Sequence, residues 1–169
     1  MTSESIVRMA MPRDEDGLMD LCKTLYGENA LFSMSDDKVR YYLRRAFARD
    51  SAMIGVIGKP QHIEAAIFML IGQFWYSHDK HLEELFNYVR PEHRKSKHAQ
   101  ALITWAKELS ADTPLPLVIG VLSTERTAAK VRLYRRQLGD PIGAFFFYDT
   151  KHVAQGPAAG EQPADVFDK

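Results

Sequence analysis

The chain has 169 residues, of which 22 are basic and 22 acidic, so its formal net charge is zero. Hydrophobic residues make up 46% and charged residues 26%, a balance that is typical of a globular domain and excludes a largely disordered chain. Zero net charge also excludes a strong long-range attraction to nucleic acid or to an anionic membrane. Any anion-binding site must therefore be local.

The redox and targeting features are those of a cytoplasmic protein. A single cysteine, Cys22, leaves no internal disulfide to form and fits a reducing compartment. The first residues lack the apolar core of a signal peptide, and no apolar run is long enough to span a bilayer. We expect a soluble protein with one domain over residues 1–150 and a disordered tail over 151–169, where Ala, Gly, Pro and acidic residues dominate.

Apolar periodicity and turn signals predict an alternation of strands and helices. In chain order, the first half is predicted to form a strand over 6–11, a helix capped by Asp14, a helix over 35–49, and strands over 52–57 and 63–74 joined by a hairpin at 58–61. The second half is predicted to form a strand over 82–89, a helix over 97–109, a strand over 117–122, a helix that Ser123 or Thr124 caps and Gly139 ends, and a last strand over 142–148.

The piece from Leu82 to Leu122 is a strand–helix–strand unit, so its two strands should be parallel with a right-handed crossover. The fold class expected is therefore α/β with a mixed sheet: mostly antiparallel strands, a central parallel βαβ unit and flanking helices. In such units ligands bind beyond the carboxyl ends of the strands, where the next helix begins.

That point is the stretch PEHRKSKHAQ, residues 91–100. The first amides of a helix have no partners inside the helix and bind anions. Four cationic side chains, Arg94, Lys95, Lys97 and His98, gather at this end, where acidic residues would normally stabilise a helix. The arrangement indicates a local anion site, although a solvated basic loop would show the same charge run.

Two further features suit acid–base chemistry. Glu83 and Glu84 are neighbours on a predicted strand, so their side chains should point to opposite faces, and a half-buried one could act as a general base. The alternative is a pair of exposed carboxylates. Tyr134, in the helical stretch LYRRQLG, could donate a proton or simply pack in the core. The nearby basic residues Arg132, Arg135 and Arg136 share a helical face that could meet a phosphate or remain solvated.

We predict no metal site from the sequence. His78 and His81 have the spacing H-x-x-H, but the other histidines offer no matching spacing and zinc sites need three or four ligands. Cys22 lies on the apolar face of the first predicted helix, which favours a buried, inert thiol.

The segments ELFNYVRPEHRKSKHAQALITWAKELS and VLSTERTAAKVRLYRRQLG together resemble the GNAT superfamily of acyl-CoA-dependent N-acyltransferases, over about residues 5 to 149. The first segment resembles the family's strand, V-x-P-x-x-R turn and pyrophosphate-binding helix. The second resembles its later strand and tyrosine-bearing helix. The helix-rich N-terminal part and the segment STERTAAKVRLYRRQ also resemble the corresponding parts of GNAT-like proteins encoded by bacteriophages.

The resemblance implies acetyl-CoA, or another acyl-CoA, as cofactor. The family's loop reads Gln or Arg, two residues, Gly, one residue, then Gly or Ala; Arg94 and Ala99 match, and Lys97 stands where the first glycine is expected. The implied cofactor contacts are Val89 beside the pantetheine arm, and Arg94, Lys95, Ser96, Lys97, His98, Ala99 and Lys130 around the phosphates.

The resemblance also implies a mechanism of direct transfer to a primary amine whose identity the sequence leaves open. Glu83 or Glu84 would take a proton from the amine, an amide near Val89 would stabilise the oxyanion, and Tyr134 would protonate the departing CoA thiolate. Leu122 occupies the place where some members carry a carboxylate instead.

Two functional alternatives and one prediction about subunit assembly accompany this interpretation. The chain could be a catalytically inactive module that binds CoA or an anion, for which Lys97 is the best support. It could bind nucleic acid through Arg94 to His98 and Arg132 to Arg136, although zero net charge disfavours this. The apolar stretch GAFFFYD could pair with a second subunit to form a homodimer.

Overall fold

The computed structural model describes residues 6–123 and 126–149. It divides into two compact units between Ile119 and Gly120. The first unit contains β1 (Arg8–Met9), η1 (Pro12–Asp14), α1 (Glu15–Asn29), α2 (Asp36–Phe47), β2 (Ala52–Lys59), β3 (His62–Gln73), β4 (Lys80–Val89), η2 (Pro91–His93), α3 (His98–Asp112) and β5 (Leu117–Val118). In the second unit the described residues form α4 (Thr127–Leu138).

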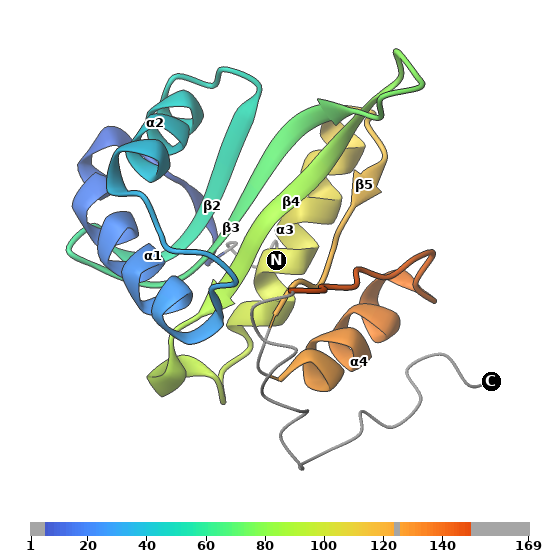
Figure 1. Ribbon diagram of the computed structural model, residues 1–169. Helices are drawn as coiled ribbons and strands as arrows, with labels where there is room; N and C mark the ends of the chain where they lie inside the picture. The colour runs from blue at the N-terminus through green and yellow to red at the C-terminus, as the bar shows by residue number, and fades with distance from the viewer. Residues whose placement is uncertain (1–5, 124–125, 150–169) are drawn as a thin grey trace, which may run out of the picture. The chain divides into compact units, whose positions relative to one another are not determined.

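The first unit is built on a five-stranded sheet in the order β1-β2-β3-β4-β5 (Figure 1). Every neighbouring pair is antiparallel except β4 and β5, which are parallel. The predicted fold class is confirmed, and the parallel pair, with α3 as its crossover, lies at one edge of this sheet. The hairpin between β2 and β3 also forms where the sequence predicts it.

Helices cover both faces of the sheet: α1 and α2 lie on one face and α3 on the other (Figure 1). The larger apolar core lies under α1 and α2, and its buried strand residues include Ile54, Val56, Phe68, Phe86 and Tyr88. The core under α3 includes Ile67, Met69, Leu82, Leu102 and Ala106. Cys22 is buried in the larger core, as predicted, and burial raises the pKa of its thiol to about 12.

A β-bulge interrupts the register of β4. Phe68 lies opposite Phe86 and Met69 opposite Glu84, so Leu85 is an extra residue without a partner on β3, and its side chain is exposed. The bulge reverses the alternation of side chains along β4. As a result, Leu82 faces α3 whereas Phe86, four residues later, faces α1 and α2.

The prediction of a strand over 142–148 is wrong. Within the described residues this segment pairs with no strand, and the side chains of Ile142 and Phe146 are exposed. An apolar run predicts burial, but a strand also needs a neighbour for its backbone, which no local pattern supplies. The predicted pairing of this segment with a second subunit stays a prediction.

Two strands and one helix are shorter than the sequence predicts. The strands predicted over 6–11 and 117–122 are only two residues long, as β1 and β5. The helix α4 begins after Arg126, whose φ of 57° is left-handed, so the predicted cap at Ser123 is wrong. Thr124 and the predicted disordered tail over 151–169 lie outside the described residues.

The helices α1 and α2 differ in how their first backbone amides are capped. Ser35 caps α2, as predicted, because its hydroxyl accepts a hydrogen bond from the Lys38 amide at 3.4 Å. Asp14 precedes α1 but makes no side-chain cap there: its carboxylate binds Arg8 at 2.7 Å and accepts from the Met11 amide at 2.8 Å. Among the described residues, no helix combines the length and apolar character that a membrane span requires.

Candidate cofactor and acceptor site

The edge of β4 is only partly covered by β5. The two strands pair at Leu82 with Leu117 and at Glu83 with Val118, and β5 ends there. In the described part of the chain, no second strand pairs with residues 85–89, although β3 continues to pair on the other side as far as Val89. A strand edge of this kind can bind an extended ligand that carries amide groups.

This edge of β4 leads into the loop that precedes α3. The Ser96 amide donates to the His93 carbonyl at 3.0 Å, and the His98 amide donates to the Ser96 hydroxyl at 3.1 Å. Within residues 6–123 and 126–149 we find no acceptor for the amides of Lys97 and Ala99. These amides begin a helix of 15 residues and are therefore suited to an anion.

Lys97 occupies its position without backbone strain. Its φ of −89° and ψ of 12° are accessible to any L residue, so the loop does not require a glycine at this position. The side chains of Lys95, Ser96 and Lys97 are exposed beside the helix start. Two lysine charges thus accompany the amides.

Arg94 is used to anchor the loop. Its guanidinium forms an ion pair with Glu28 of α1 at 2.5 Å, donates to the Val89 carbonyl at 3.3 Å and lies 5.7 Å from the Tyr88 ring centre. His98 is also turned inward and contacts Glu64 of β3 at 2.8 Å. Of the cations predicted to surround the phosphates, the first unit therefore leaves Lys95 and Lys97 as the exposed ones.

Arg90 is a second anchor that sequence reasoning missed. It is buried, its Nε donates to the Ile63 carbonyl at 2.7 Å, and its guanidinium forms an ion pair with Asp20 of α1. Buried arginine is rare unless it is paired, but an isolated sequence position gives no sign of that. Together Arg90 and Arg94 tie the end of β4 to α1.

Glu83 and Glu84 point to opposite faces of the sheet, as predicted. Glu83 lies opposite Leu70, on the face covered by α1 and α2, and Glu84 lies opposite Met69, on the face covered by α3. The Glu83 carboxylate is 3.5 Å from Nε2 of His81.

The absence of a side chain at Gly72 leaves space for the Glu83 carboxylate. A Cβ at Gly72 would lie 3.0 Å from the carboxyl carbon of Glu83, closer than side chains normally approach. His81, beside Glu83, is buried and stacks on Phe74 with ring centres 4.6 Å apart. These neighbours were not identified from the sequence, although an i, i+2 pair on a strand, such as His81 and Glu83, is a usable signal.

The loop between β3 and β4 presents aromatic surface. Phe74 stacks on Tyr76 at 5.7 Å, and the Trp75 side chain is 96% exposed. The structure places Trp75 and Tyr76 at the surface.

Tyr134 and Lys130 belong to α4 in the second unit. Lys130 donates from Nζ to the Ser123 hydroxyl at 3.1 Å, and Tyr134 is half-buried within its unit. The first unit therefore brings together Val89, the loop at 94–99 and the two glutamates along β4.

A sheet that is antiparallel up to β4 and then parallel, with α3 crossing between β4 and β5, is the fold of the GNAT acetyltransferases. The chain has this fold. No family model matches the chain, and no curated protein matches it in sequence.

Solved structures support the fold assignment. An integron cassette protein from the mobile metagenome of a salt marsh is 19% identical, with a TM-score of 0.66 over 85% of this chain and 88% of that one. AAC(6')-Iy, solved with the bisubstrate analogue CoA-S-monomethyl-acetylneamine, is 13% identical, with a TM-score of 0.66 over 85% of this chain and 95% of its own. An aminoglycoside 6'-N-acetyltransferase from Acinetobacter haemolyticus is 15% identical, with a TM-score of 0.64 over 85% and 96%.

Proposed function

We propose that the protein is an N-acyltransferase that moves an acetyl group from acetyl-CoA to a primary amine. One observation carries this proposal: the edge of β4 that β5 leaves uncovered leads directly to helix amides without acceptors in the described residues. A pantetheine arm carries amide groups and a pyrophosphate carries negative charge, so the two features suit the two parts of one ligand.

The residues of the loop fit the CoA pyrophosphate. The amides of Lys97 and Ala99 would bind phosphate oxygens, and the side chains of Lys95 and Lys97 would add charge-assisted contacts. Arg94 and His98 would hold the loop in position through Glu28 and Glu64. When it is bound, acetyl-CoA supplies a thioester as the activated acyl group.

Glu83 is our candidate for the general base. An aliphatic amine has a pKa of about 10 and must lose a proton before it can attack a carbonyl carbon. Glu83 can accept that proton directly or through a water, and His81, 3.5 Å from its carboxylate, can help to position it. Glu84, on the opposite face, is the alternative base.

Tyr134 is our candidate for the general acid. Its phenol would give its proton to the CoA sulfur as the thiolate departs, in keeping with its position in LYRRQLG. The exposed aromatic loop at Phe74 to Tyr76 supports an acceptor with a flat or apolar portion. Aminoglycosides also belong among the candidates, because two of the similar structures are named for or solved with such compounds.

Binding and turnover test different parts of the proposal. Titration with CoA by calorimetry should show saturable binding, and its absence would refute both the enzyme and an inactive CoA-binding module. Thiol release should then be followed with acetyl-CoA and a panel of polyamines, aminoglycosides, amino acids, peptide N-termini and aromatic amines.

Glu83→Gln and Glu84→Gln form a matched pair, since the residues are adjacent but face opposite sides. We expect Glu83→Gln to lower kcat by about 10²–10⁴-fold, and Glu84→Gln to have a much smaller effect. Tyr134→Phe should also lower kcat with little change in CoA affinity. CoA binding without turnover on any amine would instead favour the inactive module.

A further inference from the structure

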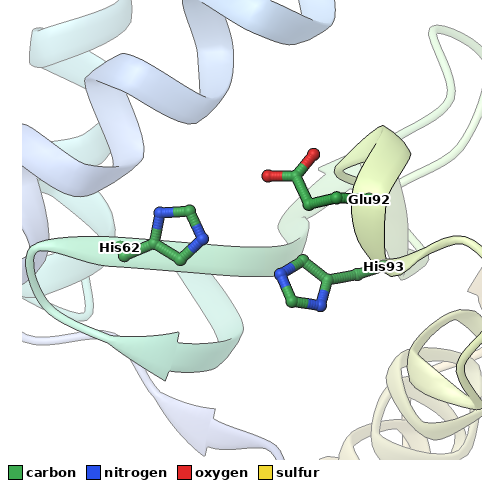
Figure 2. Close-up of side chains that lie close together, drawn as sticks. All are labelled: His62, Glu92 and His93. Carbon is green, nitrogen blue, oxygen red and sulfur yellow. The ribbon is translucent and has the colours of Figure 1, made fainter.

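Three histidines and two glutamates from separate segments gather where β3 begins and β4 ends. The residues are His62 and Glu64 of β3, Glu92 and His93 of η2, and His98 at the start of α3. Figure 2 shows His62 and His93 facing each other, with Glu92 beside them. The sequence spacing of these residues does not resemble a metal motif, and for this reason the sequence predicted no such site.

The inner part of this cluster has distances that suit a metal ion. Oε2 of Glu64 is 2.8 Å from Nε2 of His98 and 3.5 Å from Nδ1 of His93. One ligand atom from each residue lies within 4.8 Å of the others. In tetrahedral zinc, bonds of about 2.0–2.1 Å separate neighbouring ligand atoms by about 3.3 Å. Small side-chain shifts would therefore suffice.

Backbone geometry holds the carboxylate in place. Ile57 lies opposite Ala65 and Gly58 opposite Ile63, so Glu64 is the extra residue of a second β-bulge. Gly58 has a φ of 107°, and a Cβ there would lie 2.6 Å from the His62 carbonyl oxygen. The bulge needs this glycine and directs Glu64 toward the start of α3.

Glu64, His93 and His98, the inner group of the cluster, are less exposed to solvent than His62 and Glu92. The side chains of His98, His93 and Glu64 are 14%, 29% and 29% exposed, whereas His62 and Glu92 lie at the surface. A glutamate is ordinarily ionised at neutral pH, as a carboxylate metal ligand must be.

We propose that Glu64, His93 and His98 bind a divalent transition-metal ion, with zinc as the best fit to two imidazoles and one carboxylate. Water would complete the coordination. His62 and Glu92 form a second, more exposed group around His93 and are not part of the proposed ligand set.

The ion would connect both ends of the basic loop, because His93 immediately precedes residues 94–97 and His98 immediately follows them. Binding would restrict the loop that presents Lys95 and Lys97. This consequence rests on the proposed function, since it concerns the loop assigned to CoA. The ion site itself does not.

The test uses the full chain without an affinity tag and stripped of metal. Equilibrium dialysis against zinc should give one ion per chain, and cobalt should give the intense visible absorption of a tetrahedral site. His93→Ala, His98→Ala and Glu64→Gln should each weaken zinc binding by at least about tenfold, since even the loss of a ligand's supporting partner costs about 10–100-fold. Thermal melts should show that each variant is folded.

Two controls make the result specific. His78→Ala removes a histidine far from the cluster in sequence, and the double variant His62→Ala, Glu92→Gln removes the outer group; both should bind zinc as the wild type does. No binding by the wild type, or loss of binding in either control, would overturn the site. Binding that survives His93→Ala and His98→Ala would overturn it as well. Zinc binding with unchanged CoA affinity would reject only the coupling to the loop.

Discussion

The two long helices that flank the sheet begin in opposite ways. The start of α1 is preceded by a partly buried ion pair between Asp14 and Arg8, and its first turn carries the acidic residues Glu15 and Asp16. The start of α3 has no acidic residue in its first turn and is preceded by exposed lysines. The first arrangement follows the electrostatic preference of a helix N-terminus, and the second opposes it.

The two helix starts therefore have different expected roles: the start of α1 stabilises the fold, and the start of α3 is available to bind a ligand. At α1 the protein's own carboxylates neutralise the positive end of the helix, so little is left to attract a ligand. At α3 the amides of Lys97 and Ala99 and the neighbouring lysine charges remain available. Changes at the first helix start should therefore alter folding alone, whereas changes at the second should alter CoA binding.

The largest effect on stability is expected for Asp14→Asn. Asp14 is fully buried and Arg8 is about one-third exposed, so the change leaves a guanidinium without its partner. Loss of a partly buried ion pair of this kind should lower the free energy of unfolding by roughly 2–4 kcal/mol. Urea denaturation measures it. Asp16→Asn, in the exposed first turn of α1, is the matched control and should cost less than about 0.5 kcal/mol.

The same variant should change the response to acid. Burial raises the pKa of Asp14, but the hydrogen bonds from Arg8 and the Met11 amide outweigh it, so the pKa in the folded protein is below its ordinary value. The stabilisation is therefore complete above the unfolded pKa of about 3.9 and is lost as the pH falls through the lower folded value. Equal acid sensitivity of wild type and Asp14→Asn would contradict this assignment.

Lys97→Glu should move stability and binding in opposite directions. An acidic residue at the start of α3 should raise the free energy of unfolding by about 0.3–1 kcal/mol. The same change should weaken CoA binding by about tenfold or more, because it removes an exposed lysine contact and also places a negative charge beside the phosphates, a combined effect of about 1.5 kcal/mol. Calorimetry and denaturation on one preparation test both effects.

Lys38→Glu, in the first turn of α2, is the control for the helix effect without the binding effect. If Lys97→Glu weakened CoA binding no more than Lys38→Glu does, the loop at 94–97 would not be the pyrophosphate site.

Lys97→Gly should have the smallest effect. The lysine adopts an ordinary φ of −89°, so a glycine relieves no strain, and the backbone amides remain in place. We expect CoA affinity to fall by no more than about threefold, the effect of about 0.7 kcal/mol. A tenfold loss would mean that the lysine side chain, and not the backbone, holds the phosphates.

The sequence predicts those helices and strands that local apolar periodicity determines. The helices α1, α2 and α3, the β2–β3 hairpin and the strand around Glu83 follow from apolar spacing and turn residues. The segment 142–148 shows the limit of that reasoning, because an apolar run specifies no partner strand.

The candidate site divides in the same way. The opposite faces of Glu83 and Glu84 follow from strand geometry alone. The role of Arg94 does not, because its partner Glu28 is 66 residues away in sequence. The grouping of Glu64 with His93 and His98 needs a bulge and two chain reversals, and no single stretch of sequence records that combination.

The extra residue at Leu85 has a consequence for how the site can change. In a regular strand, residues an odd number apart lie on opposite faces, yet Glu83 and Phe86 share the face covered by α1 and α2. Leu85 is therefore the residue at which the alternation of side chains along β4 reverses, between Glu83 and Phe86. Deleting Leu85 would make Glu84 and Phe86 neighbours in a regular strand, on the opposite faces that they already occupy, so the deletion should leave both carboxylates and the aromatic core on their present faces.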